Sequence, residues 1–93
     1  MSDDPLIEDI RGQISGIDRS IVDAINTRLR LVAQLKSYKE SRGIDFLDPE
    51  REKRMLQDLM QTNRGPLSLE GLERLLQEIL DLTKREVQRG EST

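Results

Sequence analysis

The sequence predicts an all-α fold: a three-helix chain with one very long first helix. Apolar residues recur every three or four positions from Ile7 to Leu35, which places them along one face of a helix. Two shorter segments repeat this spacing, and no segment alternates apolar and polar residues as a β-strand does. Charged residues make up 35% of the 93 residues and aromatic residues 2%, a balance typical of long amphipathic helices.

Start and stop signals predict the helices over residues 5–41, 49–62 and 68–88. Pro5 suits a first helical turn, and Gly43 is the stop signal expected after the first helix.

The second and third helices are expected to begin at capping residues. Asp48, which a proline follows, is the predicted N-cap of the second helix, and Ser68 is the predicted cap of the third. The tail of residues 89–93 is predicted to be frayed. Residues 1–93 then form a single domain.

The first helix is too long for a compact monomer. It spans roughly 55 Å, whereas a compact domain of this size has a radius of gyration of only about 12 Å. The rest of the chain is too short to cover its whole apolar face. We therefore predict an intertwined homodimer helical bundle, in which two chains pair their long helices. The alternative is a break near residues 12–16 that gives a compact four-helix monomer.

Composition excludes several classes of function. The net charge of −3 argues against general nucleic-acid binding. The chain has no Cys and no His, which removes the thiol nucleophile, the commonest general base and the commonest metal ligand, so no metal or cofactor is expected. No segment approaches the length of a membrane span, and the N-terminus has neither a basic start nor an apolar run. We expect a cytoplasmic protein.

Two cations lie where the long helix should be apolar. Arg28 falls in phase with the apolar stripe, and Lys39 follows it by about three helical turns on nearly the same face. Burying two positive charges is costly unless an anion meets them. That anion is either a carboxylate of the protein or an anionic ligand.

Further polar residues make a ligand the better explanation. Arg11 precedes Arg28 by roughly 25 Å of helix, so one small ligand cannot touch both on the same chain. In an antiparallel pair of chains, Arg11 of one chain lies near Arg28 and Lys39 of the other. Several cations in a mostly apolar interior suit a dianionic small molecule. The remaining residues of this predicted pocket, at the start of the second helix, are Asp48, Arg51 and Glu52.

Each of these residues also has an ordinary interpretation. Arg28 can lay its stem along the apolar stripe, Asp48 can serve as an N-cap alone, and the other charged residues can form surface ion pairs worth about 0.5 kcal/mol. The functional interpretation depends on the whole set, in its order and spacing.

That set resembles one family, the all-α chorismate mutases of the AroQ class, or type II. The resemblance covers residues 5–88 and implies an intertwined dimer of three-helix chains. It is carried by an ungapped pattern of polar residues: Arg11, Arg28, Lys39, Asp48, Arg51 and Glu52.

The resemblance implies a pericyclic rearrangement of chorismate to prephenate, in phenylalanine and tyrosine biosynthesis. This reaction needs no nucleophile, metal or general base, but it needs the substrate held in its reactive conformer and charge stabilised on the ether oxygen. By resemblance, Arg28 and Arg11 of the partner subunit bind the two carboxylates of the substrate. Lys39 contacts a carboxylate and the ether oxygen.

The same resemblance assigns four further residues. Asp48 and Glu52 address the ring hydroxyl of the substrate, and Glu52 is also counted among the catalytic residues. Arg51 adds positive field, and Thr83 aligns with a hydroxyl residue that helps to hold a carboxylate.

Val87 departs from the family pattern. The family usually has Gln or Glu one turn after the Thr83 position, where it donates a second hydrogen bond to the ether oxygen. Loss of such a donor typically lowers kcat by about 10²–10³-fold. Val87 is expected to point inward with Thr83. Three explanations for the missing donor compete: Glu86 or Gln88 turns in to supply it, a partner protein raises an intrinsically weak activity, or the substrate differs from chorismate.

Related functions remain open. An amino-substituted substrate, 4-amino-4-deoxychorismate, or isochorismate in a pyruvate-lyase reaction would use the same carboxylate-binding cations. The non-enzyme alternative is a weakly active or regulatory helical module that works with an enzyme of the shikimate pathway.

Overall fold

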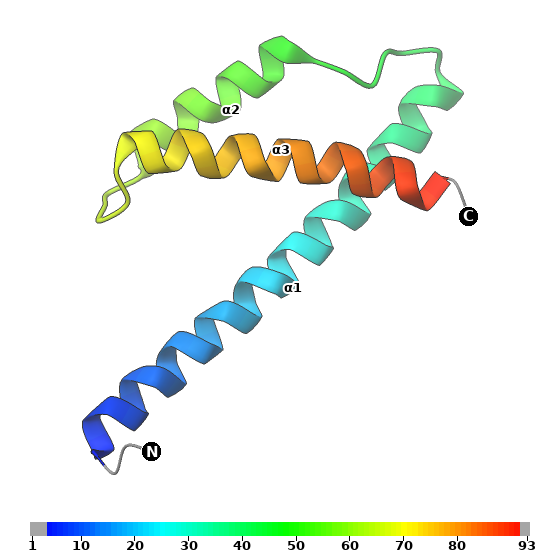
Figure 1. Cartoon of the computed structure of the whole chain (residues 1–93). Coiled ribbons are helices and arrows are strands. Elements are labelled where there is room, and N and C mark those ends of the chain that lie inside the picture. The colour runs from blue at the N-terminus through cyan, green and yellow to red at the C-terminus, as the bar shows by residue number, and fades with distance from the viewer. Residues whose placement is uncertain (1–3, 92–93) are drawn as a thin grey trace. The chain divides into compact units, whose positions relative to one another are not determined.

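The chain folds into three helices, and residues 4–91 contain no strand (Figure 1). The computed structural model describes these residues, and the side chains of residues 4–89. Helix α1 spans Pro5–Ser41, α2 spans Pro49–Thr62 and α3 spans Leu69–Glu91. The predicted all-α fold, with its very long first helix, is confirmed.

Helix α3 continues further than its sequence indicates. It runs to Glu91, three residues beyond the predicted end at residue 88, so the tail expected to be frayed is helical as far as Glu91. Residues 92–93, the rest of that tail, lie outside the described residues.

Helix α1 is continuous across its two glycines. Residues 12–16 are helical throughout, so the break required by the compact four-helix monomer is absent. The first turn is capped by Asp4, whose Oδ1 accepts hydrogen bonds from the backbone N–H groups of Leu6 at 2.9 Å and Ile7 at 3.5 Å. The chain divides into two compact units within this helix, one ending at Leu31 and the other beginning at Val32.

The apolar face of α1 is exposed. Ile14 is 54% exposed and Ile17 62% exposed, and no described residue of the helix is buried. Apolar surface left in water forgoes roughly 25 cal/mol per Å² of burial energy. Despite this apolar face, no helix within residues 4–91 combines the length and the hydropathy needed to cross a membrane.

The end of α1 is a Schellman motif centred on Gly43. The backbone N–H of Ile44 donates to the carbonyl of Lys39 at 2.9 Å, and the N–H of Gly43 donates to the carbonyl of Glu40 at 3.2 Å. Gly43 has a φ of 68°, the left-handed conformation that this motif requires. The stop signal predicted at Gly43 is therefore confirmed, and it fixes where the connector after α1 begins.

Helices α2 and α3 form an antiparallel hairpin within the second unit (Figure 1). The Ser68 Oγ accepts the backbone N–H of Gly71 at 3.0 Å, which confirms Ser68 as the cap of α3. One face of α3 carries the buried residues of the described chain: Leu72, Leu76, Thr83 and Val87.

We predict that Gly43→Ala destabilises the fold by about 1 kcal/mol, because a Cβ disfavours the left-handed conformation at this position. Urea unfolding followed by circular dichroism measures the loss. Gly43→Asn is the matched control, since Asn tolerates this conformation better, and should lose less. Equal losses for the two variants would contradict a conformational role for Gly43.

Candidate functional site

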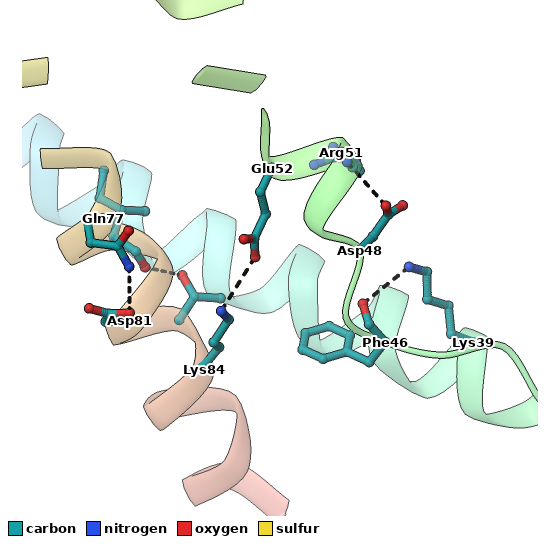
Figure 2. A network of polar contacts seen from close by, with 10 residues as sticks. Lys39, Phe46, Asp48, Arg51, Glu52, Gln77, Asp81 and Lys84 are labelled. Atoms are coloured by element: carbon teal, nitrogen blue, oxygen red, sulfur yellow. Dashed lines mark hydrogen bonds and ion pairs between the residues drawn. The ribbon is translucent and has the colours of Figure 1, made fainter. Parts of the chain in front are cut away.

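The sequence-predicted residues that follow Val32 belong to the second unit. Lys39 lies in the last turn of α1, Asp48 is the N-cap of α2, Glu52 lies in the first turn of α2, and Thr83 lies on α3. Figure 2 shows the charged side chains of this region, which reach between the end of α1, the connector and the two later helices.

Lys39 is held by the connector that follows α1. Its Nζ donates to the backbone carbonyl of Phe46 at 3.4 Å, and the side chain is half-buried (Figure 2). Glu40, the residue after Lys39, pairs with Lys36 instead, whose Nζ lies 2.7 Å from Oε1 of Glu40. An ammonium has three donors, so the contact with Phe46 leaves Lys39 able to bind an anion.

Phe46 is also fixed through its ring. The Nζ of Lys36 lies 5.7 Å from the ring centroid, a cation–π geometry, and the Lys36 side chain is only 15% exposed. Sequence reasoning did not single out Lys36 or Phe46. The one feature of the sequence that could have drawn attention to Phe46 is that the chain's single Phe lies in the connector after the first helix.

Asp48 performs the capping role predicted for it. Its Oδ1 accepts the backbone N–H of Arg51 at 3.1 Å (Figure 2). Its carbonyl accepts the N–H of Glu52 at 3.2 Å. A carboxylate has two oxygens with about four lone-pair sites, so capping and a hydrogen bond from a ligand are compatible. The cap fixes the direction in which the first turn of α2 presents Glu52, while the Arg51 side chain is exposed.

Glu52 is paired with a residue that sequence reasoning missed. Its Oε1 lies 3.5 Å from the Nζ of Lys84, which follows Thr83 on α3 (Figure 2). The pair joins two helices, α2 and α3. Helical periodicity marks Lys84 only as a residue beside the buried face of α3.

Thr83 and Val87 both lie on the buried face of α3, at 6% and 7% exposed. The inward orientation expected for Val87 is therefore confirmed. The Thr83 hydroxyl donates to the carbonyl of Ile79 at 2.6 Å, so donation to a ligand carboxylate requires the hydroxyl hydrogen to turn away from Ile79. Of the two flanking residues, Glu86 pairs with Arg89 at 3.5 Å and Gln88 is exposed.

Arg11 and Arg28 belong to the first unit, so the structure does not place them relative to the other site residues. Arg11 is exposed and its NH1 lies 3.8 Å from Oε1 of Glu8. Arg28 is half-buried on the same helix and has an interaction partner within the chain.

The family follows from comparison with known proteins. Residues 10–88 match the family described as chorismate mutase type II. The chain belongs to the type II chorismate mutase family. The resemblance drawn from the polar pattern is thus confirmed over most of its length.

Solved structures of similar fold come from the same family. Two forms of a chorismate mutase from Thermus thermophilus match with TM-scores of 0.80 and 0.83, at 30% and 29% sequence identity. The matches cover 83% and 89% of this chain, and 96% and 94% of the Thermus chains.

The curated relatives are longer proteins. Bifunctional chorismate mutase/prephenate dehydratases from Stutzerimonas stutzeri and Pseudomonas aeruginosa are 35% and 34% identical over 85 residues, which is 86% of this chain. The chain spans 23% of the length of each. A T-protein from Haemophilus influenzae is 37% identical over 51 residues, which is 55% of this chain and 14% of that protein.

Proposed function

We propose that the chain is a chorismate mutase, an isomerase that converts chorismate to prephenate. The observation that carries the proposal is the family match over residues 10–88. The second unit supports it, because Lys39, Asp48 and Glu52 are gathered there on capped helix ends. Such ends hold side chains in fixed directions, and positioning is what a pericyclic reaction needs.

The cations of the site restrain and polarise the substrate. Arg28, with Arg11 of the partner subunit, binds the two carboxylates and keeps the substrate in its compact conformer. Lys39 contacts a carboxylate and the ether oxygen, where negative charge grows as the C–O bond breaks. Arg51 adds positive field from the first turn of α2.

The polar groups of α2 and α3 fix the other end of the substrate. Asp48 and Glu52 accept hydrogen bonds from the ring hydroxyl, and Thr83 turns its hydroxyl toward a carboxylate. Val87 contributes only apolar surface beside the ether oxygen. We therefore expect a lower turnover than in a site that has a hydrogen-bond donor at this position.

The exposed stripe of α1 supports an intertwined homodimer. Charged Arg11 and apolar Ile14 and Ile17 lie along a helix that has no buried residue of its own. A second copy of the helix covers this stripe and brings Arg11 to the site of the other chain. The site is therefore incomplete in a single chain.

We also propose a partner enzyme or domain from the same pathway. The names of the curated relatives pair chorismate mutase with prephenate dehydratase, which supports a partner enzyme or domain of the aromatic pathway. Buried Val87 favours a weak activity that such a partner raises. Location in the cytoplasm stays a prediction.

The proposal is tested by the loss of chorismate absorbance with the purified chain, and by identification of prephenate as the product. Arg28→Ala should lower turnover by at least about 10²-fold, because it removes a charge-assisted clamp on a carboxylate, while the helical circular dichroism stays unchanged. Arg30→Ala, an exposed arginine two residues away, is the control and should keep full activity. Full activity in Arg28→Ala would refute the assignment of Arg28.

Val87→Gln should raise turnover, by up to about 10²-fold, because it places a hydrogen-bond donor beside the ether oxygen. The measurement is kcat for chorismate, alongside Val87→Met as a control that adds length without a donor. An unchanged kcat in Val87→Gln would indicate that Glu86 or Gln88 performs this role instead.

The Arg11→Ala and Arg28→Ala variants, mixed in equal amounts, unfolded and then refolded together, should recover about a quarter of wild-type activity. Half of the random dimers are hybrids, and each hybrid holds one intact site and one doubly altered site. The mixed sample is compared with each variant refolded alone. Activity no higher than that of the separate variants would contradict a site shared between two chains.

A further inference from the structure

We propose that Lys84 determines substrate specificity at this site: it favours a neutral hydroxyl over a cationic ammonium group at the substrate ring position that Glu52 addresses. This inference rests on the proposed function, and it adds a residue and a substrate class to that site.

This proposal rests on the ion pair between α2 and α3. The Nζ of Lys84 lies 3.5 Å from Oε1 of Glu52, with the two side chains 41% and 34% exposed (Figure 2). Each helix thus contributes one charge to a single pair at the place where the ring end of the substrate is proposed to lie. Lys84 also directly follows Thr83, whose buried side chain lies on the adjacent face of α3.

Asp81, which lies one turn before Lys84 on α3, has a partner of its own. It accepts the side-chain amide of Gln77 at 3.0 Å (Figure 2). The ion pair of Lys84 is made across to Glu52 on the other helix.

This pairing changes what Glu52 selects. An isolated carboxylate accepts a hydrogen bond from a hydroxyl or an ammonium, and its charge favours the ammonium. With Lys84 beside it, the charge of Glu52 is partly offset, and the Lys84 ammonium repels a second cation. A hydroxyl carries no charge, so it can still donate to Glu52 without this repulsion.

The pair thus points to a dicarboxylate substrate with a hydroxyl on its ring. An aliphatic amine is mostly protonated at neutral pH, so the analogue with an amino group at that position arrives as a cation. Removal of Lys84 should make the site more tolerant of this analogue while leaving the carboxylate-binding cations in place.

The experiment measures kcat/KM for chorismate and for 4-amino-4-deoxychorismate, and takes the ratio of the two for each variant. In Lys84→Met, which keeps the apolar stem, the preference for chorismate should fall about fivefold, the size expected of a partly exposed charge. Lys84→Gln should behave in the same way, and Lys84→Arg should keep the wild-type ratio. Lys53→Met is the matched control, because it removes one charge from an exposed position next to Glu52, and its ratio should stay unchanged.

A ratio is used because general loosening of the fold lowers both rates together. An unchanged ratio in Lys84→Met and Lys84→Gln, with an active wild-type chain, would overturn the role of Lys84 alone. A fall of the same size in Lys53→Met would also overturn it, because any nearby charge would then suffice. A wild-type chain that turns over neither substrate would overturn the proposed function, and this inference with it.

Discussion

The length of α1 is the constraint on which the rest of the structure depends. Its backbone hydrogen bonds continue from Pro5 to Ser41, through two glycines that weaken a helix without ending it. An unbroken helix of about 55 Å cannot fold back to cover its own apolar face. The 37-residue helix therefore leaves this face exposed, and within the first unit it separates Arg11 from Arg28 by roughly 25 Å, too far for one small ligand to touch both. Both the proposed pairing of chains and the proposed sharing of the site follow from that separation.

Helix ends supply most of the candidate site in the second unit. Lys39 lies where the Schellman motif closes α1, and Asp48 caps α2 while Glu52 lies in its first turn. These residues are held by backbone hydrogen bonds as well as by side-chain contacts. A site built in this way keeps its geometry without a large core, which suits a chain whose buried described residues all lie on one face of α3.

Sequence predicted the features that local signals specify. Gly43, Asp48 and Ser68 marked helix ends correctly, because the conformation or the side-chain hydrogen bond that they supply acts within a few residues. The end of α3 was less predictable, since Gly90, a residue type that often stops a helix, is itself helical there. The inward orientation of Val87 followed from helical periodicity alone.

Contacts between elements were beyond sequence reasoning. The pair of Glu52 with Lys84 and the contact of Lys36 with Phe46 depend on how separate segments meet, which no periodicity encodes. The family pattern named Glu52 without naming its partner. The role of Arg11 depends on a second chain, and the roles of both Arg11 and Arg28 stay predictions.

The hydroxyl of Thr83 has a consequence for the energetics of binding. Its single hydrogen is already donated to the carbonyl of Ile79. When a carboxylate arrives, that hydrogen exchanges one acceptor for another, so no hydrogen bond is added in total. The net gain from such an exchange is small compared with that of an ion pair, and the hydroxyl acts mainly on the orientation of the carboxylate. In the proposed site, Thr83 would thus select the angle at which a ligand lies, while the cations would set how tightly it is held.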